Sequence, residues 1–155
     1  CLINILEGRP LPIYGDGSQI RDWLHVTDHC RGIELIIEKG TIGQTYNIGG
    51  DNEWKNIDVV TFICNTMNDL FKASRNFKTL FPQSPCAKDE DAKSLITYVG
   101  DRLGHDIRYA IDAAKIKSEL NYSPSHTFEN GIIGTIDWYI KNTPWWISIK
   151  KRSKK

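Results

Sequence analysis

Two arginines beside glycine-rich turns are the side chains best suited to bind a charged ligand. Arg21 follows the turn Gly15–Ser18, and Arg102 lies in Gly100–Arg108, a segment dense in charge that contains two glycines. A guanidinium binds phosphate or diphosphate through paired, charge-assisted hydrogen bonds, and glycine lets the backbone approach such a ligand closely. Arg21 could instead form a surface charge pair with Asp22, which would contribute little free energy. The pattern indicates an anion site, with a structural ion pair as the competing interpretation.

Asn56 is a further candidate because it lies at the start of a predicted helix, soon after a predicted strand at residues 43–50. Ligands in open α/β sheets bind beyond the carboxyl end of a strand, close to a helix start. Asn56 could contact such a ligand or could only cap its helix, as asparagine commonly does. His105 has a similar pair of interpretations, a ligand contact or a structural side chain.

Motifs for catalysis are absent from the sequence. No glycines have the GxGxxG or GxxGxxG spacing of a dinucleotide site, and no tyrosine is followed four residues later by a lysine. The P-loop, HExxH, GxSxG and EF-hand patterns are also missing. The four cysteines and four histidines lack the spacing of a zinc site. We therefore assign no catalytic, cofactor-binding or metal-binding residue within this chain.

The elements that must position these residues form a mixed α/β pattern. A helix end is expected at residues 2–6, and longer helices are expected at 27–39, from 56 or 58 to 70, at 112–120 and from 127 to Pro144. Extended or strand segments are expected at 9–14, 20–26, 43–50, 95–100 and 108–111. These strands are too short and too few to build a large sheet alone, so we expect them to complete a sheet that lies mostly outside this chain.

Helix caps and apolar stripes follow from the same patterns. Thr27, Asn56 or Asp58, and Thr127 are the predicted N-caps. Spacings of three and four residues predict the buried stripes Ile33, Ile36 and Ile37 in one helix, Val59, Ile63, Met67 and Leu70 in the next, and Ile132, Ile136, Tyr139 and Ile140 in the last. Residues 72–93 show no period and are interpreted as a loop or insertion.

Composition excludes several classes of protein. The 155 residues carry a formal net charge of +1, which gives no field that would attract nucleic acid or a membrane surface. The basic tail at residues 150–155 is expected to be a solvated, frayed terminus. No stretch reaches the roughly 18 apolar residues of a membrane span. Because the chain starts at Cys1, without methionine and without a signal peptide, we expect a piece of a longer cytoplasmic protein.

Four segments, taken in order, resemble the carboxy-terminal part of the dTDP-glucose 4,6-dehydratases, which belong to the extended short-chain dehydrogenase/reductase superfamily. They are LPIYGDGSQIRDWLHVTDHCRGI, GQTYNIGGDNEWKNIDVV, ITYVGDRLGHDIRYAIDAAKI and TFENGIIGTIDWYIKN. Related epimerases and decarboxylases share YGDGxQxRDW in looser form. The combination of NxxKNxD with DRxGHDxRYAID is more specific to the dehydratases. The resemblance covers nearly the whole chain except residues 72–93 and the basic tail.

The resemblance implies a role for particular residues. Those expected to contact the nucleotide are Pro12, Ile13, Tyr14 and Asn56, and Arg21 and Arg102 match the diphosphate-binding arginines. The segment Asp101, Arg102, Leu103, Gly104 and His105 matches the substrate loop. Leu103 departs from the family, which usually has proline there, so this loop is expected to be less rigid.

The resemblance also implies a division of labour between two domains. Residues 1–149 would form the carboxy-terminal, nucleotide-sugar-binding portion of an extended short-chain dehydrogenase/reductase fold. An amino-terminal Rossmann domain, absent from this sequence, would bind NAD, supply the catalytic groups and mediate homodimerisation. The expected substrate is dTDP-glucose, which the complete enzyme would convert to dTDP-4-keto-6-deoxyglucose for deoxysugar synthesis, whereas this piece alone would be inactive. Two alternatives remain: a UDP-sugar epimerase or decarboxylase of the same superfamily, and a non-catalytic nucleotide-binding module.

Overall fold

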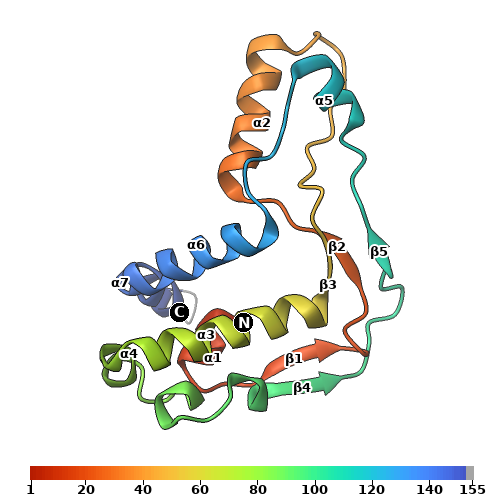
Figure 1. Cartoon of the computed structure of the whole chain (residues 1–155). Helices are drawn as coiled ribbons and strands as arrows, with labels where there is room; N and C mark the ends of the chain where they lie inside the picture. Colours follow the sequence, from red (N-terminus) through yellow and green to blue (C-terminus); the bar gives the residue numbers. More distant parts are fainter. Residues whose placement is uncertain (153–155) are drawn as a thin grey trace.

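Helices and short strands alternate along the chain, as the sequence predicts for an α/β protein (Figure 1). The computed structural model describes residues 1–152. The helices are α1 Leu2–Leu6, α2 Val26–Lys39, α3 Asn56–Ala73, α4 Arg75–Leu80, α5 Ala114–Leu120, α6 Phe128–Lys141 and α7 Thr143–Arg152, with 3₁₀ helices at Pro85–Lys88 and Ala92–Leu95. The strands are β1 Leu11–Tyr14, β2 Ile20–Asp22, β3 Glu53–Lys55, β4 Ile96–Val99 and β5 Arg108–Tyr109.

The strands form two small sheets whose ends carry the predicted site. β1 and β4 pair in parallel, with Tyr14 opposite Val99. A second sheet has the order β3-β2-β5, in which β2 is antiparallel to β3 and parallel to β5. Because parallel strands end at the same edge, the turn after β1 and the segment after β4 start side by side. The segment after β4 contains the predicted residues Asp101 to His105, and the turn after β1 lies between the predicted residues Tyr14 and Arg21.

A hydrophobic core joins β1 to helices α1, α3, α6 and α7. The predicted stripe of α3 is confirmed, because Val59, Ile63 and Met67 are buried and Leu70 packs against them. The last predicted stripe is also confirmed, with Ile136 buried and its three companions packed on the same core. The alternation along β1 directs Leu11 and Ile13 into this core and leaves Pro12 and Tyr14 exposed.

Helices α2 and α5 lie next to each other in an arm that projects from the rest of the molecule (Figure 1). The arm has its own small core, in which Ile116 and Leu120 of α5 contact Ile36 and Ile48. The predicted stripe of α2 was therefore right for Ile36 only. Ile33 and Ile37 are exposed, because α2 packs through Gly32, where an added Cβ would lie 2.7 Å from the side chain of Ile48.

Two of the predicted N-caps were wrong, although both helices begin within about one residue of the predicted position. The strand expected at 20–26 ends at Asp22, and α2 begins at Val26 with His25 as its N-cap, where Thr27 was predicted. The imidazole of His25 accepts a hydrogen bond from the Thr27 N–H and so performs the capping. Helix α3 has Lys55 at its N-cap without a side-chain cap, so neither Asn56 nor Asp58 caps it. Thr127 caps α6 as predicted, by accepting a hydrogen bond from the Asn130 N–H.

The strand predicted at residues 43–50 does not form, and this segment has an irregular backbone. Its far end is held by a side chain, because the carboxylate of Asp22 accepts hydrogen bonds from the N–H groups of Gly50 at 2.8 Å and Asn52 at 2.9 Å. Backbone donors that bond to a carboxylate are unavailable to a strand ladder. The paired strand begins only at Glu53, where β3 joins β2.

The segment 72–93 contains regular structure where a loop was predicted. Helix α4 and the two 3₁₀ helices pack on α3 through Phe81 and Cys86, which are both buried. Each of these helices is only four to six residues long, so their apolar residues share no period that the sequence could reveal. The helix predicted from Thr127 ends before Pro144, as expected, but a further helix, α7, was not predicted. Pro144 lies in the first turn of α7, where proline needs no hydrogen-bond donor.

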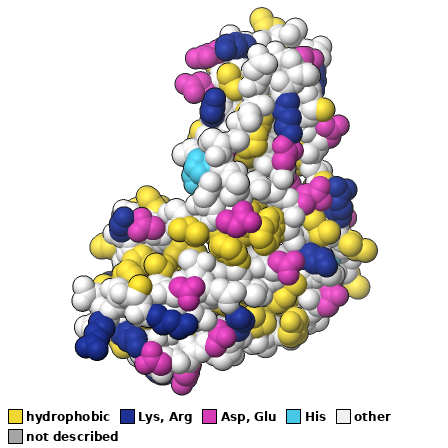
Figure 2. All heavy atoms as spheres, in the orientation of Figure 1, with side chains coloured by type: hydrophobic (Ala, Val, Ile, Leu, Met, Phe, Trp, Pro, Cys, Tyr) yellow, Lys and Arg dark blue, Asp and Glu magenta, His cyan; other side chains and the backbone are white. Residues whose placement is uncertain are grey.

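The surface carries charges of both signs. Figure 2 shows lysine and arginine interspersed with aspartate and glutamate over the visible face. Within residues 1–152, none of the helices combines the length and apolar character that a membrane span requires. Of the predicted basic tail, Lys150 to Arg152 are helical as the end of α7, which corrects the expectation of a frayed terminus there. Residues 153–155 of that tail lie outside the described residues.

Candidate functional site

Tyr14 meets the segment 100–107 at the end of β1. The guanidinium carbon of Arg102 lies 4.9 Å from the centre of the Tyr14 ring, a distance typical of a cation–π contact. The ring of His105 stands nearly perpendicular to that of Tyr14, with 6.3 Å between their centres. Arg102 Nη2 and His105 Nε2 are 3.1 Å apart. Three residues that the sequence predicts to bind the ligand are thus in mutual contact.

Asp101 anchors this segment through both carboxylate oxygens. Oδ1 accepts hydrogen bonds from His105 Nδ1 at 2.7 Å and from the Arg102 N–H at 2.8 Å, and Oδ2 accepts one from Gln19 Nε2 at 3.1 Å. The hydrogen bond from His105, above all, lowers the pKa of the Asp101 carboxyl from its ordinary value. Asp101 is therefore an ionised group that orients the loop, and its oxygens are occupied by the protein's own donors.

Gln19 is a part of the site that sequence reasoning did not single out. Its side chain is buried at 7% exposure, and its Nε2 donates to Tyr14 O and to Asp101 Oδ2. The backbone carbonyl of Gln19 accepts a hydrogen bond from the Asn56 N–H at 2.9 Å. Its Oε1 has no hydrogen-bond partner among the described residues. A buried acceptor normally has a hydrogen-bond partner. Gln19 contacts Tyr14, Asp101 and Asn56, which are all predicted to bind the ligand. The one signal for Gln19 in the sequence is its position two residues before Arg21, in a polar segment.

Arg21 contacts the other end of the same segment. Its guanidinium donates to Ile20 O at 2.6 Å and to Asp106 O at 3.1 Å, and its Cζ lies 5.5 Å from the centre of the Tyr109 ring. The charge pair with Asp22 does not form, because the Asp22 oxygens bind Gly50 and Asn52. An arginine carries five N–H donors, so Arg21 keeps donors for a ligand.

The other residues predicted to bind the ligand differ in how exposed their side chains are. Leu103 is fully exposed at the tip of the loop, and Gly104 has a φ of 71°, a conformation that a residue with a Cβ rarely adopts. Asn56 is the half-buried first residue of α3, and its side chain makes no hydrogen bond to the part of the chain that the structure describes. Ile13 is buried in the core, so only its backbone could contact a ligand.

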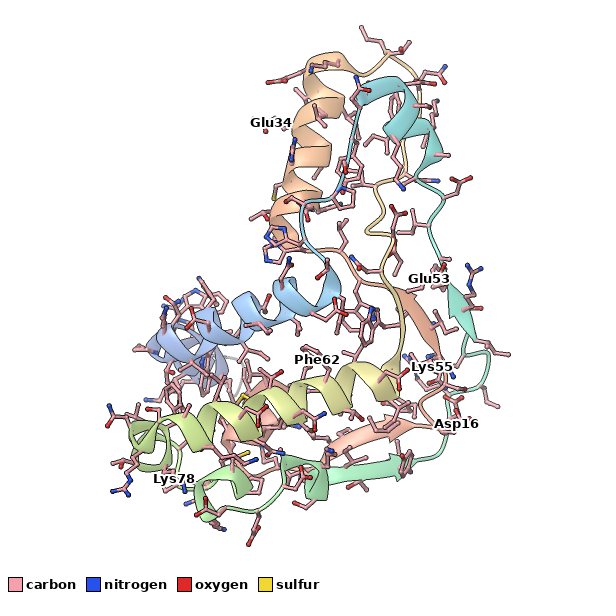
Figure 3. The ribbon with its side chains drawn as sticks, viewed as in Figure 1. Asp16, Glu34, Glu53, Lys55, Phe62 and Lys78 are labelled. Carbon is pink, nitrogen blue, oxygen red and sulfur yellow. The ribbon has the colours of Figure 1, made fainter. Side chains whose placement is uncertain are left out.

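An ion pair across the second sheet fixes the end of the loop. Arg108 of β5 donates two hydrogen bonds of 2.7 Å each to Glu53 of β3. Figure 3 labels Glu53 beside the second sheet. The pair lowers the pKa of Glu53 and raises that of Arg108, because each charge stabilises the other. Just beyond, a hollow of about 420 Å³ is lined by His29, residues 46–48 and residues 109–112. It shares Tyr109 with the surroundings of Arg21 and was not predicted.

Known proteins are similar to this chain in sequence and in fold. The family model described as GDP-mannose 4,6 dehydratase matches residues 1–135. A dTDP-glucose 4,6-dehydratase of Salmonella typhimurium is 47% identical over 96% of this chain, and one of Escherichia coli is 49% identical over 94% of it. The crystal structure of a dTDP-glucose 4,6-dehydratase from Bacillus anthracis in complex with NAD superposes with a TM-score of 0.74 at 43% identity, covering 95% of this chain and 40% of that one. A Streptomyces venezuelae dTDP-glucose 4,6-dehydratase with NAD bound gives 0.75 at 36% identity, covering 94% of this chain and 38% of that one.

These matches confirm the resemblance seen in the sequence and also its partial extent. The chain spans only 37% of the length of the Salmonella and Escherichia coli relatives. The family match includes both sheets and the segment 100–107, which contacts Tyr14 and Arg21. The chain therefore belongs to the GDP-mannose 4,6-dehydratase family.

Proposed function

We propose that this chain is the substrate-binding part of a dTDP-glucose 4,6-dehydratase and that the loop after β4 holds the diphosphate of dTDP-glucose. The contact of Arg102 and His105 with Tyr14 supports the proposal most directly. It presents a cation, a ring face and an imidazole edge at one point, beside a glycine-rich turn. A nucleoside diphosphate offers the matching charge and ring face. Relatives that carry the dehydratase name share about half of their aligned residues with this chain.

Each predicted residue receives a role in this proposal. Arg21 and Arg102 would bind the diphosphate from opposite ends of the segment 101–106. Tyr14, Pro12 and the amide of Asn56 would contact the nucleotide, and Ile13 would contribute backbone atoms only because its side chain is buried. Asp101, Leu103, Gly104 and His105 would form the loop that closes over the substrate. Asp101 would orient His105 without contacting the phosphate, since two anions repel.

The chemistry of the complete enzyme would take place outside these residues. In the proposed reaction, hydride passes from C4 of the glucose to NAD, water is eliminated across C5 and C6, and the hydride returns to C6. The nicotinamide would supply this redox chemistry when bound to a Rossmann domain that precedes residue 1, since the glycine motif for it is missing here. This chain would provide binding energy from the non-reacting nucleotide, which holds the sugar in place.

The proposal extends to the organisation of the protein. Residues 1–149 would act as one substrate-binding domain, with 72–93 as an elaboration that packs on α3. The cytoplasmic location stays a prediction from the sequence, and a homodimer formed through the preceding domain stays a prediction from the resemblance.

A comparison of nucleotides tests the proposal. We expect the complete protein to convert dTDP-glucose to the 4-keto-6-deoxy product, and to bind dTDP more tightly than UDP or GDP in calorimetric titrations. Turnover of UDP-glucose to an epimer would favour the epimerase alternative. Turnover of GDP-mannose in preference to dTDP-glucose would assign the substrate in the family's name. Binding of dTDP without turnover, in a protein shown to hold NAD, would favour the non-catalytic module.

A further inference from the structure

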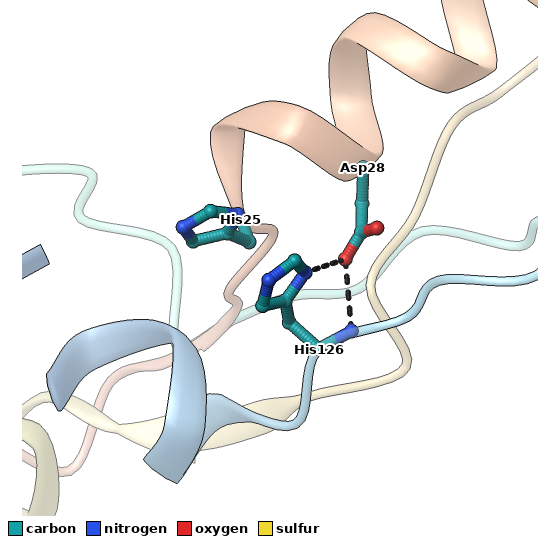
Figure 4. A group of neighbouring side chains, drawn as sticks. All are labelled: His25, Asp28 and His126. Atoms are coloured by element: carbon teal, nitrogen blue, oxygen red, sulfur yellow. Dashed lines mark hydrogen bonds and ion pairs between the residues drawn. The ribbon is translucent and has the colours of Figure 1, made fainter. Parts of the chain in front are cut away.

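A second cluster of polar side chains lies where the arm joins the rest of the molecule. His25 is the N-cap of α2, Asp28 lies in its first turn, and His126 comes from the connection that leads into α6. Figure 4 shows the His126 imidazole bonded to the Asp28 carboxylate, with the His25 imidazole beside that of His126. None of the three contacts Tyr14, Arg102 or the hydrogen bonds of Asp101. The cluster is thus separate from the proposed substrate site.

Asp28 is held rigidly and is almost completely buried, at 1% exposure. Its Oδ1 accepts hydrogen bonds from the N–H and the hydroxyl of Ser125, at 3.0 Å and 2.6 Å. Its Oδ2 accepts from the His126 N–H at 3.0 Å and from His126 Nδ1 at 2.9 Å. A buried carboxylate with this many donors is fixed in orientation, as a metal ligand must be.

The two imidazoles are also placed by the fold. Their rings stack with 4.0 Å between centres and 27° between planes. His25 Nδ1 lies 2.7 Å from Thr27 Oγ1, and a Cβ added at Gly131 would come within 3.4 Å of the His25 ring. Both rings are only partly buried. An ion could therefore reach them from solvent, and water could fill the positions that the protein leaves open.

We propose that His25, Asp28 and His126 form a binding site for a divalent transition-metal cation such as Zn²⁺. One potential ligand atom from each residue lies within 4.8 Å of the other two. Two imidazole nitrogens and one carboxylate oxygen are a ligand set that Zn²⁺ accepts, with a water molecule in the fourth position. Metal–ligand bonds of about 2.0–2.2 Å place tetrahedral ligands about 3.3–3.6 Å apart, so the ligand atoms, which lie within 4.8 Å of one another, need to approach by up to about 1.5 Å.

Binding would exchange one hydrogen bond for two metal bonds. The cation would bind His126 Nδ1 and Asp28 Oδ2, and the proton that Nδ1 donates to Asp28 would move through solvent to Nε2, so that the imidazole stays neutral. Asp28 would retain three of its hydrogen bonds, those from Ser125 and from the His126 N–H. The movement then falls mainly on His25, whose ring is held by Thr27 alone among hydrogen-bonding partners in the described residues.

The site would join two parts of the fold. His25 and Asp28 belong to α2 in the arm, and His126 precedes α6, which packs on the core of the body. A ligand that binds only the folded state raises its stability in proportion to the logarithm of the ligand concentration. The cation is therefore expected to resist separation of the arm from the body.

The experiment uses the complete protein after treatment with a chelator. Calorimetric titration with Zn²⁺ should give one site per chain, and added Zn²⁺ should raise the unfolding temperature until the chelator is returned. His25→Ala and His126→Ala should each weaken Zn²⁺ binding at least tenfold. His29→Ala, which removes an exposed histidine one turn further along the same helix, is the matched control and should bind as the parent does.

Exposed cysteines are the main competitors for the ion, because Cys30 lies on the same helix. Cobalt(II) distinguishes them, since thiolate ligands give an intense near-ultraviolet band that nitrogen and oxygen ligands lack. A spectrum without that band, lost in His126→Ala, is the expected result. No binding by the parent, equal binding in the histidine variants, or a thiolate band that Cys30→Ser removes would overturn the proposal. The cluster would then serve only to hold the connection before α6.

Discussion

Arg102 lies over the ring of Tyr14, with its guanidinium carbon 4.9 Å from the ring centre, although the two residues come from distant parts of the sequence. The parallel pairing of β1 and β4 produces this contact, because it brings the carboxyl ends of both strands to one edge. Asp101 then turns the loop back by bonding to His105 and Gln19. The contact places a cation where the resemblance predicts a diphosphate.

Loss of Arg102 should weaken nucleotide binding. In the complete protein, Arg102→Ala is expected to lower the affinity for dTDP roughly ten- to hundredfold, the effect of losing a charged hydrogen-bond donor of about 1.5–3 kcal/mol. Arg21→Ala should have a similar effect. Arg102→Lys should retain part of the affinity, because lysine keeps the positive charge but cannot donate the paired hydrogen bonds of a planar guanidinium. Calorimetric titration measures each value. Arg75→Ala, an exposed arginine at the start of α4, is the control and should bind normally. Unchanged affinity in both Arg21→Ala and Arg102→Ala would refute the site assignment.

The carboxyl group of Asp101 should titrate at unusually low pH. Its pKa is lowered mainly by the hydrogen bond from His105, so the ordered loop is favoured above the ordinary aspartate pKa of about 3.9 and is lost as the pH falls through the lowered value. The carboxyl ¹³C shift of Asp101, followed by NMR, should therefore give a midpoint below that of a free aspartate. His105→Ala should move the midpoint upward. A midpoint that stays in place in His105→Ala would show that this hydrogen bond does not form.

The core under α3 should tolerate little loss of volume. Met67 is fully buried, so Met67→Ala is expected to lower the free energy of unfolding by about 2–4 kcal/mol through lost burial and a residual cavity. Asn65→Ala on the exposed side of the same helix should change it by less than about 0.5 kcal/mol. Urea unfolding of the complete protein gives both values. Equal effects of the two substitutions would contradict the assigned face of α3.

Several features followed from the sequence because their causes are local. The stripe Val59, Ile63 and Met67 is regular over three turns, so a helix with one apolar face is the arrangement that buries all three. Thr127 caps α6 through a hydrogen bond within one turn. The turn after β1 needs positive φ, and Gly15 and Gly17 supply it at 57° and 76°. The resemblance in four quoted segments identified the family from the same local strings of residues.

The errors arose where a distant partner outweighs a local preference. Residues 43–50 have a strand-like composition, but the carboxylate of Asp22 takes the backbone donors of Gly50 and Asn52. Ile33 and Ile37 have helical spacing, yet α2 turns Gly32 toward Ile48 and leaves both isoleucines outside. No pattern within either segment reveals these partners.

The sequence by itself determined the buried faces of α3 and α6, the glycine turns and the identity of the charged residues, because hydrophobic periodicity and backbone φ depend on neighbours along the chain. Only the tertiary structure decided which of those residues meet. Asp28 and His126 lie in separate segments, and in the sequence each resembles a solitary surface residue. Folding places His126 Nδ1 2.9 Å from Asp28 Oδ2 and stacks the His25 ring on that of His126. Such groupings come from the docking of whole elements against one another, and the physical constraints on that docking are spread over the entire core.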